Sequence, residues 1–170
     1  MSVQRRASAV IVAGLIVGVT SGAALGVVWA ALAPRVPLVV QGGAAVPDSF
    51  QPEEYFASDV AFGALALVAG IAIAIGLAYM RREHLFSVLV AALLSAGVGT
   101  AAMWFVGTRL GSVDIEGLEA TTEPVVMDGP LEVSLGAMFL MWPLASAAVI
   151  TVLALSDWIS ELRSSVREEP

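Results

Sequence analysis

The sequence contains no cysteine, no lysine and only one histidine, His84. Without cysteine there are no disulfides, thiolate metal sites, iron–sulfur ligands or cysteine-linked lipids. One histidine leaves no pair for a haem or a two-histidine metal site, so we expect neither a metal nor a cofactor. All eight cationic residues are Arg, and the fifteen carboxylates bring the net charge to −7, which disfavours nucleic-acid binding.

Charge is scarce along the whole chain. Charged residues make up 14% of the 170 residues, 58% are hydrophobic, and the mean hydropathy is +0.88. Soluble domains carry about a quarter charged residues, so this chain has too few to cover a globule with a polar surface. The composition excludes an ordinary cytosolic enzyme domain and a disordered chain, and it predicts an integral membrane protein.

Four apolar stretches are long enough to cross a bilayer as helices, which takes about 20 residues each. They lie at 7–33, 60–80, 85–108 and 133–156, and none contains Asp, Glu, Lys, Arg or His. The first stretch is longer than the apolar core of a signal peptide, so we expect it to be retained. The sequence therefore predicts a single all-α membrane domain over 1–170, built as a bundle of four transmembrane helices.

The distribution of arginine predicts the orientation in the membrane. Six of the eight arginines precede the first span, separate the second from the third, or follow the fourth. By the positive-inside rule these segments are cytoplasmic, which places both termini and the tail 157–170 inside the plasma membrane. The segments 34–59 and 109–132 are then external, and they carry ten of the fifteen acids.

The two external segments contain short β-prone runs, at 36–40 and 124–127, next to turn-forming glycines and prolines. These runs favour a small β-like extracytoplasmic cap, and irregular loops over the helix ends are the alternative. The acids of these segments match no calcium-loop spacing, so we interpret them as a solvated acidic face. His84 is interpreted as an exposed residue of the short inner turn 81–84 rather than a pH sensor.

A glycine ladder stands out in the first span. Its members are four residues apart and therefore form one flat ridge that a second helix backbone can approach closely: Gly14, Gly18, Gly22 and Gly26. Ser95 and Gly99 in the third span have the same spacing and are a plausible partner surface. Packing inside the bundle is the favoured interpretation, and docking of another subunit or a second copy is the alternative.

The fourth span contains Trp142 and Pro143, flanked by Met138 and Met141. Proline removes a backbone hydrogen bond and crowds the preceding turn, which predicts a kink within this span. The favoured interpretation is a static kink that shapes the bundle. The alternative is a hinge, or a groove for a lipid or a quinone-like molecule with the tryptophan and the two methionines as its walls.

The other aromatic residues are expected to anchor the helices at the membrane interfaces. Trp29 and Trp104 fall near the outer interface, and Tyr79 and Trp158 fall near the inner one. After residue 157 the apolar positions recur in steps of four, which predicts a short amphipathic extension on the inner membrane surface.

Four short motifs give the chain a likeness to a known family. APRVPLVV at 33–40, EYFASD at 54–59, PLEV at 130–133 and MWPLA at 141–145 resemble segments of small actinobacterial membrane proteins grouped as domain of unknown function 2567. The resemblance implies a four-span layout. It implies no activity and no functional residues.

The sequence offers no arrangement of a nucleophile with a histidine base, so we expect no enzymatic activity. The favoured function is a non-catalytic accessory or scaffolding subunit of a larger respiratory or cell-envelope complex, with other integral membrane subunits as partners. The alternative is binding or transport of a lipid or a small apolar molecule. Ion transport is disfavoured because the four spans hold no ionisable group.

Overall fold

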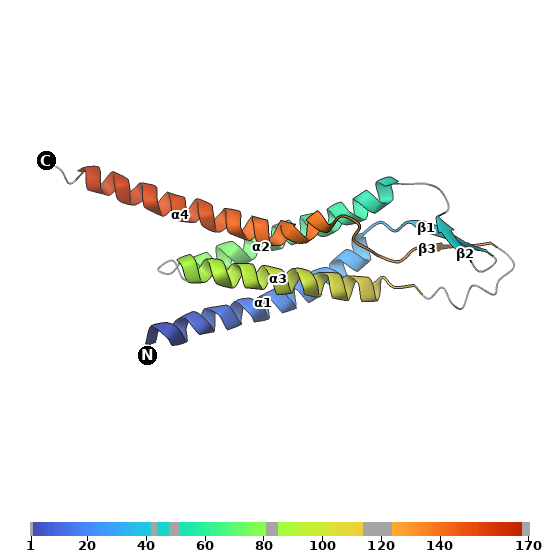
Figure 1. Cartoon of the computed structure of the whole chain (residues 1–170), viewed down its shortest axis with the longest axis horizontal. Helices are drawn as coiled ribbons and strands as arrows, with labels where there is room; N and C mark the ends of the chain where they lie inside the picture. Colours follow the sequence, from blue (N-terminus) through green and yellow to red (C-terminus); the bar gives the residue numbers. More distant parts are fainter. Residues whose placement is uncertain (1, 42–43, 48–51, 81–84, 114–123, 168–170) are drawn as a thin grey trace.

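The computed structural model describes residues 2–41, 44–47, 52–80, 85–113 and 124–167. Its four long helices are α1 (Ser2–Leu32), α2 (Pro52–Met80), α3 (Leu85–Leu110) and α4 (Met141–Arg167). Each contains a segment long and apolar enough to cross a membrane. Figure 1 shows the helices running along one long axis, with a small sheet at one end. The predicted four-helix architecture is confirmed, and the chain is a multi-pass membrane protein.

The helix bounds differ from the predicted spans. Helix α1 begins at Ser2, and α2 begins at Pro52, well before residue 60. Proline suits the first turn of a helix, and Glu53 and Glu54 are favourable near its positive N-terminal end. Hydropathy marks the apolar length of a helix, whereas its polar ends depend on caps and helix propensity. The segment between the first two helices is therefore shorter than 34–59.

The fourth span also differs at both of its ends. A short 3-10 helix, η2 (Gly136–Leu140), leads into α4, and residues 133–135 are not helical. At the other end α4 continues without interruption to Arg167. The predicted extension after residue 157 is thus the last part of α4 itself.

The bundle is made of two pairs of parallel helices. Helix α1 packs mainly along α3, α2 packs mainly along α4, and α3 also contacts α4. Near the sheet, Trp29 of α1 meets Phe62 of α2 edge to face, with ring centroids 5.0 Å apart. At the opposite end, Ala78, Val88 and Ile150 form a second apolar cluster.

The cap is a three-stranded antiparallel sheet in the order β2-β1-β3. Its strands are β1 (Pro37–Gln41), β2 (Ala44–Pro47) and β3 (Val125–Asp128). The backbone N–H of Leu131 donates to the carbonyl of Gly111 just after α3, at 3.1 Å. The β-prone runs of the two segments between spans therefore pair with each other, and their sheet is tied to the end of the bundle.

Candidate functional site

The glycine ladder lies against α3. A Cβ added to Gly22 would stand 2.8 Å from the Cα of Gly99, and one added to Gly26 would stand 2.6 Å from the carbonyl oxygen of Met103. The other two ladder glycines match this pattern one and two turns earlier, with Gly18 against Ser95 and Gly14 against Ala91. A step of four on α1 thus meets a step of four on α3. The structure places the ridge inside the bundle, where it leaves no room for another subunit.

Trp142 lies in the middle of the bundle and is fully buried. A Cβ on Gly99 would stand 2.6 Å from its Cη2, and a Cβ on Gly70 would stand 2.6 Å from its carbonyl oxygen. The indole therefore occupies space left by glycine on α3, while its backbone lies against α2. It is a core side chain and not the wall of a groove open to lipid.

The neighbours of Trp142 also face the bundle. A Cβ on Gly63 of α2 would stand 2.6 Å from the Sδ of Met138 and 3.4 Å from the Cγ of Met141. Pro143 lies in the first turn of α4, where a missing N–H costs little because the first N–H groups of a helix lack intrahelical partners. Where the sequence predicted a kink in one continuous helix, the chain instead changes from the 3-10 helix η2 to α4, just before Pro143.

An apolar groove does exist between α2 and α4, further along the helices than the residues predicted to form one. It has a volume of about 520 Å³ and is lined only by aliphatic side chains: Leu67, Ile71, Ile75, Ala145, Ala148, Val149, Val152 and Leu153. The groove contains no polar anchor, so it fits a hydrocarbon chain without distinguishing one from another.

A buried carboxylate joins the bundle to the segment before η2. Asp59 is 1% exposed, and its carboxylate oxygens accept hydrogen bonds from the backbone N–H groups of Ser134 at 2.9 Å and Leu135 at 2.8 Å. The expectation that this acid belongs to a solvated face is therefore wrong. One general rule points to such a role. The first N–H groups of a helix lack acceptors within the helix, so a carboxylate from elsewhere in the chain can bind them.

Trp29 is fully buried, so it is not an interfacial anchor. Its indole N–H donates to the carbonyl of Ser58 at 3.2 Å, which links α1 to α2 near the cap. The other three predicted anchors are exposed, as an aromatic belt requires: Trp104, Tyr79 and Trp158.

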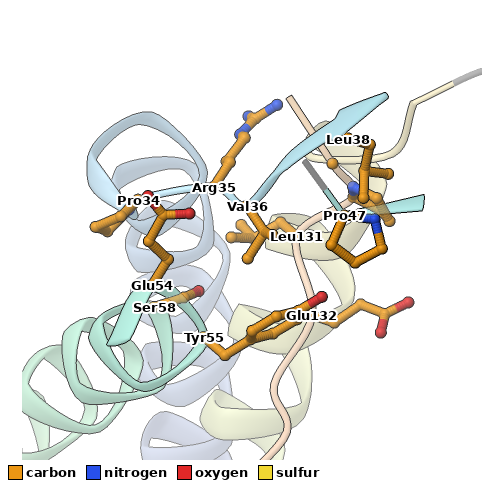
Figure 2. A pocket seen from close by; sticks show the side chains of 12 residues that line it. Pro34, Arg35, Val36, Leu38, Pro47, Glu54, Tyr55, Ser58, Leu131 and Glu132 are labelled. Atoms are coloured by element: carbon orange, nitrogen blue, oxygen red, sulfur yellow. The ribbon is translucent and has the colours of Figure 1, made fainter. Parts of the chain in front are cut away.

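A pocket lies between the cap and the first turns of α2, as Figure 2 shows. Its volume is about 230 Å³, and prolines, aliphatic side chains, one arginine and two glutamates line it: Pro34, Arg35, Val36, Leu38, Pro47, Glu54, Tyr55, Ser58, Gly129, Pro130, Leu131 and Glu132. Sequence reasoning missed this pocket because its residues come from four separate stretches of the chain. We call it the cap pocket.

Two polar groups of the cap pocket have defined environments. The guanidinium of Arg35 donates to the carbonyl of Ala30 at 3.1 Å, which caps the end of α1 and holds the guanidinium there. The hydroxyl oxygen of Ser58 is buried and has no hydrogen-bond partner within the part of the chain that the structure describes. Because Ser58 lines the pocket, this unpaired hydroxyl lies beside it.

Some predicted residues lie outside the described residues. These are the turn 81–84 with His84, which was predicted to be cytoplasmic, and five acids that were predicted to be external: Asp48, Asp114, Glu116, Glu119 and Glu123. Among the residues that are described, no group of three or more His, Cys, Asp or Glu side chains is placed to hold a metal ion.

The fold and its sites define a four-span membrane protein with a small cap and a pocket at one end of the bundle. Comparison with family models, with curated proteins and with solved structures finds no match to the chain. The resemblance to domain of unknown function 2567 therefore stays a prediction.

Proposed function

We propose that this chain is a non-catalytic accessory or scaffolding subunit of a larger membrane complex, and that the cap pocket receives a segment of a partner subunit. The cap pocket carries this proposal. Pockets that bind small molecules usually measure about 300–1,000 Å³. The cap pocket, at about 230 Å³, is smaller and suits one or two side chains of a protein partner.

The chemistry of the pocket favours the same occupant. Its aliphatic and proline walls bury apolar surface, while Arg35 and Glu132 offer charges of both signs at its margin. The hydroxyl of Ser58 adds a buried hydrogen-bonding group. An apolar centre with a polar rim is typical of protein interfaces.

The helices themselves support a structural rather than a transport role. Asp59 directly precedes the second predicted span, and both of its carboxylate oxygens accept hydrogen bonds from backbone N–H groups. From residue 60 to residue 80, and throughout the apolar parts of α1, α3 and α4, the sequence has no Asp, Glu, Lys, Arg or His. Ion and proton pathways normally require such groups within the membrane.

We place the chain in the plasma membrane with both termini in the cytoplasm. The arginine distribution supports this orientation, because six of the eight arginines fall on the side of the termini. The cap and its pocket then face the extracytoplasmic side, so the partner segment approaches from outside the membrane or from its outer surface.

The test is purification of the tagged full chain from its native membrane in mild detergent, comparing two charge reversals. Glu132→Arg changes an exposed residue that lines the cap pocket, whereas Asp128→Arg makes the same change of charge on β3 outside the lining. We expect Glu132→Arg to lose a partner protein that the unmodified chain and Asp128→Arg retain in stoichiometric amount. If all three forms purify without a partner, or if all three retain it equally, the pocket is not the contact.

The alternative function is binding of a lipid or another small apolar molecule. The groove between α2 and α4 favours it, since about 520 Å³ of aliphatic space fits a hydrocarbon chain. Ala148→Trp would fill this groove, while Ala154→Trp adds the same side chain at an exposed position outside it. Native mass spectrometry that shows a bound lipid lost only with Ala148→Trp would favour the alternative.

A further inference from the structure

The inner half of α4 extends beyond the rest of the bundle. Ile150 and Leu153 are the last residues of α4 in the apolar cluster at the end of the bundle away from the cap. Beyond them, α4 continues to Arg167, which is about 20 Å at 1.5 Å per residue. Figure 1 shows this end of α4 passing the inner ends of α2 and α3 and diverging from α1.

The projecting part of α4 carries a heptad repeat. Apolar residues recur in alternating steps of three and four: Val152, Leu155, Ile159, Leu162 and Val166. The first three are 62%, 50% and 38% exposed, so the described part of this chain leaves each of them partly exposed. Alternating steps of three and four bring these positions onto one seam of the helix, which is the pattern of a coiled coil.

The residue types in this repeat indicate which kind of coiled coil it forms. Val152, Ile159 and Val166 occupy the a positions, and Leu155 and Leu162 occupy the d positions. Branching at Cβ in the a positions, combined with leucine at d, favours two parallel strands over trimers or tetramers. The partner helix that best fits this seam is therefore one with the same residues in the same direction.

We propose that residues 152–166 of α4 form a parallel two-stranded coiled coil with α4 of a second copy of this chain. Two copies inserted in one membrane share the same orientation, so their α4 helices are already parallel. Two heptads are too short to pair strongly in water, but confinement of both chains to one membrane raises their effective concentration.

The residues beside the seam complement each other across such a pair. Trp158 occupies the g position and Arg163 the e position of the next heptad, which face each other between the strands of a parallel coiled coil. The guanidinium of one copy can then lie over the indole of the other, a favourable cation–π contact. Asp157 and Glu161 fall at the outward f and c positions, so no carboxylates oppose each other.

A membrane-surface helix fits these observations less well. To lie on the membrane the segment would have to bend away from the transmembrane part, and helices bend sharply at proline or glycine. The sequence has neither between residues 144 and 167, and α4 is continuous over this length. Its polar face carries acids as well as arginines, whereas helices that bind anionic lipids are predominantly basic on that face.

The test is disulfide cross-linking of the full chain in liposomes, which is straightforward because the sequence has no cysteine of its own. Single cysteines at the d position Leu155 and the a position Ile159 are compared with cysteines at the outward positions Ser160 and Ser164. We expect the first two to give about ten times more cross-linked dimer than the last two, since only the seam positions bring their Cβ atoms together.

A second measurement uses the mass of the purified chain in detergent. Ile159→Asp places two carboxylates opposite each other in the seam and should convert the dimer to a monomer, while Ser160→Asp adds the same charge outside the seam and should leave it dimeric. Equal cross-linking at all four positions would overturn the proposal. So would an absence of cross-linking together with protection of the cysteine at 159 by lipid, which would instead indicate a helix on the membrane surface.

Discussion

Substitution of Gly22 by alanine tests the contact between α1 and α3 with the smallest possible change. The added Cβ would stand 2.8 Å from the Cα of Gly99, and its other near neighbours are also backbone atoms of that residue. A side chain can rotate away from a new methyl group, but a helix backbone cannot. The two helices must therefore separate, and every ladder contact loosens with them.

The expected loss of stability is the difference between two terms. Overpacking costs about 1–3 kcal/mol, and we take the upper end because the clash is with backbone. Alanine regains about 1 kcal/mol of helix propensity relative to glycine. The free energy of unfolding should thus fall by about 2 kcal/mol for Gly22→Ala. For Gly14→Ala, whose Cβ would stand 3.1 Å from the carbonyl oxygen of Ala91, the two terms should nearly cancel.

Gly97→Ala is the matched control, because a Cβ at Gly97 has no neighbour within 4 Å. This variant should gain up to about 1 kcal/mol from helix propensity alone. Unfolding of the purified chain by SDS in mixed micelles, followed by the fluorescence of the buried Trp29 and Trp142, measures all three variants. Equal stabilities for Gly22→Ala and Gly97→Ala would refute the close approach of α1 and α3.

Three further experiments test the orientation, the contact of Asp59 and the place of Pro143 in α4. A cysteine at Ser49 should react with an impermeant thiol reagent on intact cells and a cysteine at Ser165 should not; the reverse pattern would overturn the orientation. Asp59→Asn should lower the free energy of unfolding by about 1–3 kcal/mol, because an amide can accept only one of the two backbone hydrogen bonds well. The exposed Asp128→Asn is its control and should change stability by less than about 0.5 kcal/mol. Pro143→Ala should also change stability by less than about 0.5 kcal/mol, and a gain well above that would mean that this proline interrupts a continuous helix.

The membrane-spanning architecture was predictable from sequence because its cause is local. A helix in lipid satisfies its own backbone, so a long apolar run without charge is sufficient to identify a span. The ladder was also readable, since a step of four marks one ridge on any helix. Its partner on α3 was recognisable because Ser95 and Gly99 repeat the same step.

Burial of individual side chains depended on tertiary contacts that no local pattern contains. Trp29 and Trp142 are both tryptophans in apolar helices, and nothing in their neighbours along the chain reveals that they are buried. The space for Trp142 exists because Gly99 stands on a different helix. The cap pocket was out of reach for the same reason, because strand pairing between segments far apart in the sequence creates it.

The hydrogen bonds of the buried Asp59 restrict movement at the junction between α2 and the segment before η2. The carboxylate of Asp59 accepts hydrogen bonds from the backbone of Ser134 and Leu135, which directly precede η2, and η2 leads into α4. The backbone carbonyl of the neighbouring Ser58 accepts the indole N–H of Trp29. Charge-assisted hydrogen bonds are about twice as strong as neutral ones, so this junction resists bending. The cap pocket, which Ser58 also lines, is therefore fixed to the start of α4. In the proposed assembly, a partner segment in that pocket is held at a set position relative to α4, the helix through which two copies pair on the other side of the membrane.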